Sequence, residues 1–248
     1  MRLLGDVSVL EGTLNEKRFA LMTGLCSLIG ADAWAWSIAA ETRPGAHPAF
    51  SICLMDGIPE NKFGSLLKAV EHPEMAELQT PFMTEFARNG PQFTRLRHQF
   101  VDEARFRDCG ALELWHQAGI DSLILSARHT RCGSVTAIGI YRKVGRPTFS
   151  ERESRIAHII LSEVDWLHED VMPNHPNEGV ASLSPRLRQV LNFLLTGKTR
   201  KEIALELDIS IHTLGDYIKE IYQRFGVRSH PELLRRFFEG DGGDAPTP

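Results

Sequence analysis

Residues 199–225, TRKEIALELDISIHTLGDYIKEIYQRF, contain two helical patterns separated by a tight turn. Thr199, followed three residues later by Glu202, predicts a helix start at which the two residues cap each other's backbone. The second pattern begins after Ser210, whose hydroxyl suits the N-cap of a helix. Its apolar side chains follow helical spacing and predict one buried stripe: Ile211, Leu214, Ile218, Ile221, Tyr222 and Phe225. A short helix, a tight turn and a longer helix with a polar outer face predict a helix-turn-helix.

A further helix is expected on each side of this pair. Ser184 and Pro185 suit the first turn of the preceding helix, which ends at Gly197. Ser229 with Glu232 caps the following one. Together they predict an all-α domain of four helices over residues 183–238.

This region resembles the LuxR-type DNA-binding domain. The resemblance rests on the following pieces: Leu183–Ser184, Arg186, Val190–Leu191, Gly197, Lys201–Glu202–Ile203–Ala204, Leu207, Ile209–Ser210, Thr213 and Gly226–Val227–Arg228–Ser229. It implies a domain that binds double-stranded DNA as a dimer, with its third helix in the major groove. Two departures stand out. Leu187 replaces the family's usual Glu, and residues 213–217 read Thr-Leu-Gly-Asp-Tyr where the family usually has Thr-Val-Lys-x-His.

The charge distribution agrees with nucleic-acid binding by this region alone. Residues 184–238 carry ten Lys/Arg and six Asp/Glu, a net charge of +4, within a chain of net charge -4. The predicted DNA-binding residues are Arg200, Lys201, Ser210, His212, Thr213, Gly215, Asp216, Tyr217 and Lys219.

Asp216 has three interpretations. A carboxylate in the major groove accepts a hydrogen bond from the cytosine amino group, which would alter sequence specificity while basic residues hold the phosphates. Alternatively, the helix-turn-helix has lost DNA affinity and serves a protein contact. In the third interpretation Asp216 is only a solvated helix residue.

The region before the helix-turn-helix domain mixes strand and helix patterns. Strands are predicted at 33–39, 49–55, 121–130 and 134–143, and helices at 15–29, 61–76, 81–89, 100–118 and 150–171. Ser150 with Glu153 caps the last helix. Its long apolar stripe predicts a contact with a second copy: Ile156, Ile160, Val164, Leu167 and Val171. The pattern indicates an α+β fold, an antiparallel sheet with packed helices.

The order of these elements resembles the GAF/PAS-like sensory domains that precede LuxR-type domains. The length and plan also resemble the acyl-homoserine-lactone receptors, but their Trp-x-x-x-Tyr and Asp-Pro motifs are absent. The nearest stretches are Phe63–Leu67 and His72–Pro73, so a lactone ligand is not predicted. Candidate pocket residues are Trp34, Trp36, Phe50, Trp115, His116 and Tyr141. The alternative is that these aromatic residues only form the core.

We therefore predict a sensory domain at 1–170, a linker at 171–182, a DNA-binding domain at 183–238 and a disordered tail at 239–248. No apolar run is long enough to span a membrane, and no secretory signal is recognised, so a cytoplasmic protein with reduced cysteines is expected. His129 and Cys132 alone do not make a metal site.

No catalytic motif is found, so neither an enzyme activity nor a cofactor is predicted. The predicted function is a transcription regulator that senses a small molecule or partner and acts as a homodimer on a pseudo-palindromic operator. The alternative is a protein-interaction module without DNA affinity.

Overall fold

The chain divides into two compact units, Met1–Glu169 and Asp170–Pro248. The computed structural model describes residues 2–12, 14–40, 51–130, 134–168, 183–195 and 198–238. Phe50, the predicted linker 171–182 and the predicted tail 239–248 lie outside the described residues.

The N-terminal unit is built on an antiparallel sheet in the order β2-β1-β5-β4-β3. Its described strands are β1 (Ala33–Ala40), β2 (Ser51–Asp56), β3 (Gln92–Leu96), β4 (Ile120–His129) and β5 (Ser134–Lys143). The sequence predicted every strand except β3. That strand is only five residues long and includes Arg95, so it carries a weak alternating signal.

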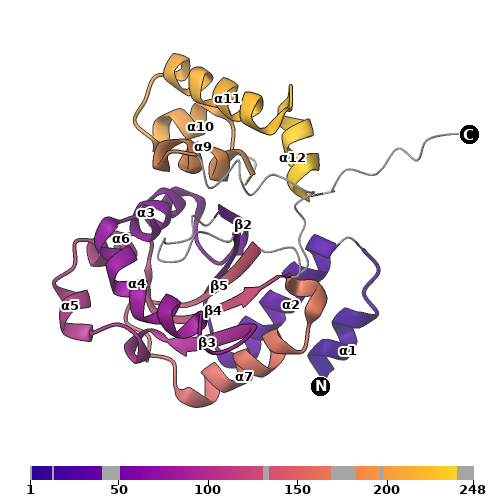
Figure 1. Ribbon diagram of the computed structural model, residues 1–248, viewed down its shortest axis with the longest axis vertical. Coiled ribbons are helices and arrows are strands. Elements are labelled where there is room, and N and C mark those ends of the chain that lie inside the picture. Colours follow the sequence, from indigo (N-terminus) through magenta and orange to yellow (C-terminus); the bar gives the residue numbers. More distant parts are fainter. Residues whose placement is uncertain are drawn as a thin grey trace, which may run out of the picture. The chain divides into compact units, whose positions relative to one another are not determined.

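Helices cover both faces of this sheet (Figure 1). On one face lie α2 (Leu14–Ile29) and α7 (Glu151–Ser162), and on the other α3 (Glu60–Val70), α4 (Pro73–Phe86) and α6 (Ala111–Gln117). The remaining helical segments of this unit are α1 (Arg2–Ser8), α5 (Glu103–Arg107) and the 3-10 turns η1 (Arg97–Gln99) and η2 (Asp165–His168). The α+β prediction is confirmed, because helices pack on an antiparallel sheet.

Four helix predictions for this unit were wrong in extent. The helices expected at 61–76 and 81–89 are instead α3, which ends at Val70, and α4, which begins at Pro73 and continues through Pro81 to Phe86. The helix expected at 100–118 is split into α5 and α6, because Asp102 caps a separate short helix through the amides of Ala104 and Arg105. The helix expected at 150–171 ends at Ser162 and gives way to η2. Its predicted capping box at Ser150 and Glu153 is present.

The C-terminal unit consists, within its described residues, of α9 (Pro185–Leu195), α10 (Arg200–Glu206), α11 (Ile211–Phe225) and α12 (His230–Phe238). Its core is formed by apolar side chains from all four helices: Leu187, Val190, Leu191, Leu194, Ile203, Leu214, Ile218, Ile221, Phe225 and Leu233. One member of the predicted stripe was wrong, because Ile211 is 55% exposed at the first position of α11. The predicted fold of four helices is confirmed.

No helix in the described part of the chain is long and apolar enough to cross a membrane.

Candidate nucleic-acid interface and ligand cavity

The turn between α10 and α11 is closed by backbone geometry and by two caps. α10 starts at the Thr199–Glu202 capping box, in which Glu202 Oε2 accepts from the Thr199 amide at 2.6 Å. The helix ends where Asp208 takes a left-handed conformation, φ 50°, and the Ile209 amide donates to the Ala204 carbonyl at 3.0 Å. Ser210 then caps α11 by accepting from the Thr213 amide at 3.0 Å. These local bonds fix the angle at which α11 leaves the turn.

The outer face of α11 carries polar side chains in a row. His212, Asp216 and Lys219 are exposed, and their spacing of four and three residues places them on one face of the helix. Gln223 continues that face and is also exposed. Sequence reasoning missed Gln223, although its spacing of seven from Asp216 and four from Lys219 was the available signal.

The other predicted contact residues of α11 flank this row. Thr213, Gly215 and Tyr217 are half-buried. Ser210 and Thr213 also bond to each other through their hydroxyl oxygens at 2.9 Å, so both are engaged in the N-cap. A Cβ built on Gly215 meets no atom within 4 Å, so packing inside this unit does not require a glycine there.

Three of the predicted DNA-binding residues have charged side chains that are available to a ligand. Within the described residues, the side chains of Lys201, Asp216 and Lys219 form no ion pair or hydrogen bond. Arg200 differs, because its guanidinium lies near the Tyr222 hydroxyl of α11. Burial raises the pKa of Tyr222, and the nearby charge of Arg200 partly offsets that rise. Sequence reasoning did not reveal that Arg200 lies near Tyr222.

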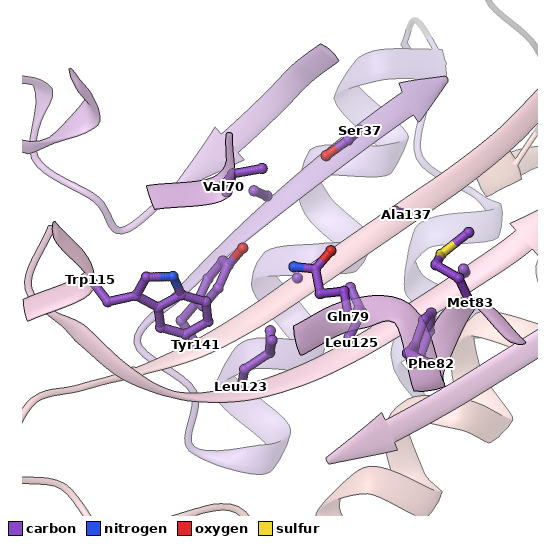
Figure 2. A pocket seen from close by; sticks show the side chains of 13 residues that line it. Ser37, Val70, Gln79, Phe82, Met83, Trp115, Leu123, Leu125, Ala137 and Tyr141 are labelled. Atoms are coloured by element: carbon purple, nitrogen blue, oxygen red, sulfur yellow. The ribbon is translucent and has the colours of Figure 1, made fainter. Parts of the chain in front are cut away.

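The N-terminal unit contains a cavity between its sheet and the helices α3, α4 and α6 (Figure 2). Its volume is about 60 Å³, enough for a few waters. The lining side chains are apolar or uncharged: Ala35, Ser37, Val70, Gln79, Phe82, Met83, Trp115, Leu123, Leu125, Ala127, Ala137, Gly139 and Tyr141.

Two of the predicted pocket residues, Trp115 and Tyr141, line this cavity. Their rings meet edge to face with centroids 5.8 Å apart. Trp115 is 2% exposed, and its Nε1 has no hydrogen-bond partner in the described structure. Tyr141 folds over Gly139, where any larger residue would collide with the ring. Burial raises the pKa of Tyr141, so the phenol stays neutral.

The other predicted pocket residues lie elsewhere. Trp34 and Trp36 point to the opposite face of the sheet, because successive strand residues alternate and Ala35 faces the cavity. There Trp36 Nε1 donates to the Leu167 carbonyl at 3.1 Å, and Trp34 packs edge to face on Phe19. The prediction that these two line the pocket does not hold for this cavity.

His116 also lies outside the cavity. Its side chain is 38% exposed, and its Nε2 lies 4.0 Å from the Asp121 carboxylate.

Comparison with known proteins agrees with the class that the C-terminal unit defines, a helix-turn-helix domain. Residues 181–237 match the family of bacterial regulatory proteins of the luxR type. The C-terminal unit is therefore a LuxR-family helix-turn-helix domain, and the predicted resemblance is confirmed.

Curated relatives share this domain. The chain is 35% identical over 63 residues to a probable HTH-type transcriptional regulator, GfsR, of Streptomyces halstedii, covering 25% of this chain and 26% of the relative. It is 45% identical over 56 residues to the transcriptional regulatory protein FixJ of Bradyrhizobium diazoefficiens, covering 23% and 27%. The chain thus spans about a quarter of the length of the curated relatives it matches. The family and these relatives are transcription regulators and not enzymes.

Among solved structures, SdiA in complex with octanoyl-rac-glycerol aligns with 95% of this chain and 91% of its own, at 16% identity and a TM-score of 0.44. A crystal structure of Escherichia coli SdiA aligns with 96% of both chains, at 14% identity and a TM-score of 0.36.

Proposed function

We propose that this chain is a one-component transcription regulator that binds a pseudo-palindromic operator through residues 183–238. The observation that carries the proposal is the outer face of α11, where Asp216 and Lys219 are exposed and unpaired; Lys201 of α10 is exposed and unpaired as well. Unpaired lysines bind phosphates, and the row on α11 is free to reach base edges in the major groove. A protein that binds operator DNA is expected in the cytoplasm, where that DNA lies.

The test of DNA binding uses the full chain and a library of duplexes. We expect affinity that falls steeply with salt, because lysine–phosphate contacts release counterions. The double replacement Lys201→Ala, Lys219→Ala should weaken binding to all DNA sequences alike. It should also reduce the steepness of the plot of log affinity against log salt concentration by about 0.9 for each phosphate that is no longer neutralised. Arg200 is left intact because its charge also lies near Tyr222 of α11. Lys68→Ala, which removes an exposed lysine of α3, is the control and should change neither quantity.

The second candidate function is a protein-interaction module, which the acidic Asp216 favours because a carboxylate repels phosphates. The two functions predict different results in the same experiment. Salt-sensitive binding by the wild type supports the regulator. Its absence across the whole library, at low as well as physiological salt, supports the interaction module instead.

We further propose that residues 1–170 are a GAF/PAS-like sensory domain joined by the linker 171–182. The cavity supports an uncharged, largely apolar ligand, because none of its lining residues is charged. The unpaired Nε1–H of Trp115 would donate to an acceptor oxygen of that ligand. A ligand of a few heavy atoms fits a cavity of this volume.

Trp115→Phe tests this site, since it keeps most of the ring and removes the N–H donor. Small molecules that co-purify with the full chain would be identified by mass spectrometry and then titrated back. We expect roughly tenfold weaker binding in the variant, as for one neutral hydrogen bond of about 1 kcal/mol plus the desolvated acceptor. Trp34→Phe is a matched control, because it also removes a buried, unpaired indole N–H but on the face away from the cavity. An equal loss of ligand affinity in the two variants would contradict this ligand site.

A homodimer is the proposed assembly. On α7, Ile159 is 58% exposed and Ile156 and Ile160 are half-buried, although the helix buries Ser154, Ala157 and Leu161 toward its own unit. A helix that leaves such apolar side chains open is suited to pack against its copy in a two-fold dimer.

A further inference from the structure

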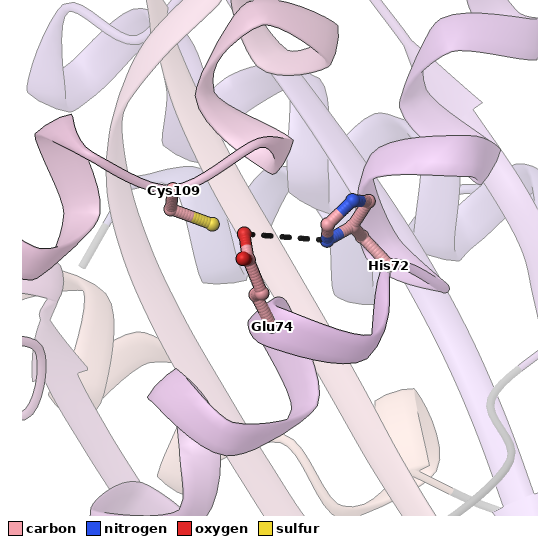
Figure 3. A group of neighbouring side chains, drawn as sticks. All are labelled: His72, Glu74 and Cys109. Carbon is pink, nitrogen blue, oxygen red and sulfur yellow. Dashed lines mark ion pairs between the residues drawn. The ribbon is translucent and has the colours of Figure 1, made fainter.

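Three side chains with metal-binding atoms converge at the start of α4, outside both the cavity and the helix-turn-helix domain (Figure 3). His72 is the N-cap residue of α4 and Glu74 lies in its first turn. Cys109 comes from the loop before α6. One nitrogen, one carboxylate oxygen and one sulfur of this trio lie within 4.8 Å of one another.

This spacing is close to what a tetrahedral ion requires. Zn²⁺ with bonds of about 2.0–2.3 Å places its ligand atoms roughly 3.3–3.8 Å apart. His72 Nδ1 lies 3.9 Å from Glu74 Oε2, and Figure 3 shows the ring nitrogen directed at the carboxylate. Small side-chain movements would bring all three atoms to bonding distance of one ion.

The hydrogen bonds at the trio orient Glu74 and Cys109 and leave His72 Nδ1 without a hydrogen bond. Glu74 Oε2 accepts from the Gly110 amide at 2.7 Å, and Cys109 Sγ accepts from the Ala111 amide at 3.3 Å. His72 Nδ1 is buried and has no hydrogen-bond partner among the described residues. A buried nitrogen without a partner costs free energy, and a bound cation would give it one.

A cleft of about 310 Å³ opens two members of the trio, Glu74 and Cys109, to solvent. Besides Glu74 and Cys109, its lining includes the carboxylates of Glu77 and Asp108 and one cation, Arg105. The Arg105 guanidinium lies 3.6 Å from the Glu77 carboxylate, so Glu77 partly neutralises the positive charge of Arg105. The cleft therefore gives a cation an entry path and leaves room for water as a fourth ligand.

We propose that His72, Glu74 and Cys109 bind one Zn²⁺ ion. A combination of imidazole, thiolate and carboxylate is the donor set of zinc sites, whereas Mg²⁺ and Ca²⁺ prefer oxygen alone. Three protein ligands and an open position leave the fourth place to water. The ion joins the start of α4 to the start of α6, the two helices that contribute Gln79, Met83 and Trp115 to the cavity.

The experiment measures metal binding by the metal-free full chain, without DNA. Titration with Co²⁺ should give a thiolate-to-cobalt charge-transfer band and the intense visible bands of a tetrahedral site. Competition with a chromophoric chelator should then give one Zn²⁺ per chain. Cys109→Ser should abolish the charge-transfer band. His72→Ala should weaken Zn²⁺ by more than the roughly 10–100-fold that loss of an outer-shell partner costs.

Matched controls come from the same unit. His116→Ala removes an exposed histidine of α6, and Cys26→Ala removes another buried cysteine. Both should keep the wild-type cobalt spectrum and zinc affinity. If Cys109→Ser fails to fold by circular dichroism, Glu74→Gln replaces it, since the amide oxygen still accepts from Gly110 while the carboxylate is lost.

Three results would overturn the proposal. They are no Zn²⁺ binding by the wild type, a cobalt spectrum without thiolate charge transfer, and unchanged affinity in folded His72→Ala and Glu74→Gln chains. The last result would place the ion at other residues.

Discussion

Asp208 is the residue on which the helix-turn-helix turn depends. Among the described residues it is the one non-glycine with positive φ, 50°. Asp and Asn tolerate the left-handed conformation, whereas a β-branched residue does not. We predict that Asp208→Asn leaves stability almost unchanged and that Asp208→Val lowers it by about 1–2 kcal/mol.

The measurement is urea unfolding followed by circular dichroism. All four tryptophans lie in residues 34–166, so their fluorescence reports the N-terminal unit alone. The fluorescence transition should stay fixed in both variants, and a shift there would mean that the effect is not local to the turn.

Asp216 is the residue on which specificity is expected to depend. Its carboxylate is exposed and unpaired on the outer face of α11, and Gly215 beside it leaves open space. A carboxylate accepts from the cytosine amino group, whereas an asparagine bonds both the N6 and N7 of adenine. We predict that Asp216→Asn moves the preference at one position per half-site from cytosine toward adenine, and that Asp216→Ala relaxes it by about 1–3 kcal/mol.

Selection of binding sites from random duplexes measures this. Glu113→Ala removes an exposed carboxylate from α6 and should leave the selected motif unchanged. Identical motifs for wild type, Asp216→Asn and Asp216→Ala would mean that Asp216 is only a solvated helix residue.

At the scale of elements, the sequence predicted most reliably what is decided locally. The capping boxes at Ser150–Glu153 and Thr199–Glu202 form as predicted, because each involves residues three apart. The end of α7 was not predicted. Val164 and Leu167 are buried, as they would be on the apolar stripe of a longer helix, but a turn and η2 bring them into the core instead. A pattern of buried positions does not distinguish these two backbone paths.

The cavity shows a second limit of sequence reasoning. Trp34 and Trp36 lie on one face of β1 because strand residues alternate, but the sequence pattern does not tell which face of the sheet carries the cavity. That is decided by pairing with β5, where Ala35 lies opposite Gly139 and leaves space beneath the ring of Tyr141. The trio of His72, Glu74 and Cys109 was invisible for a similar reason, because its members come from α4 and a distant loop.

His168 joins three elements of the N-terminal unit. Its Nε2 donates to the Leu161 carbonyl of α7 at 2.9 Å, and its Nδ1 accepts from Thr136 of β5 at 2.6 Å. Burial, followed by the charges of Arg128 and Arg18, lowers its pKa to about 4, although the Leu161 bond opposes the shift. The ring is therefore neutral in the folded protein at neutral pH.

This lowered pKa predicts loss of stability in mild acid. Since the unfolded chain binds the proton near pH 6.5 and the folded one only near pH 4, the contribution is complete above pH 6.5 and is lost as pH falls toward 4. The full loss, which is complete only below pH 4, amounts to about 3 kcal/mol, and about 2 kcal/mol of it is reached at pH 5. Urea unfolding followed by tryptophan fluorescence at pH 7 and pH 5 measures it. His168→Gln should lower the free energy of unfolding at pH 7, and that free energy should then change less between pH 7 and pH 5. His116→Gln should show the same pH dependence as the wild type. Parallel curves for wild type and His168→Gln would assign the acid sensitivity to other groups.

At the scale of the whole molecule, the proposed dimer makes operator binding depend on α7, an element outside the DNA-binding unit. Ile159→Glu places a charge on the exposed apolar face of α7, where burial against a second copy would require its desolvation. We predict that sedimentation shifts this variant from dimer to monomer at micromolar concentration. Affinity for a pseudo-palindromic operator should fall at least about tenfold, while the weaker affinity for an isolated half-site stays unchanged.

Val144→Glu is the control, because it adds the same charge at a residue that is 48% exposed in the turn after β5. If Ile159→Glu remains dimeric, or if the wild type is a monomer even with operator DNA, α7 is not the dimer contact. The exposed isoleucine would then have to be explained by packing of a different partner.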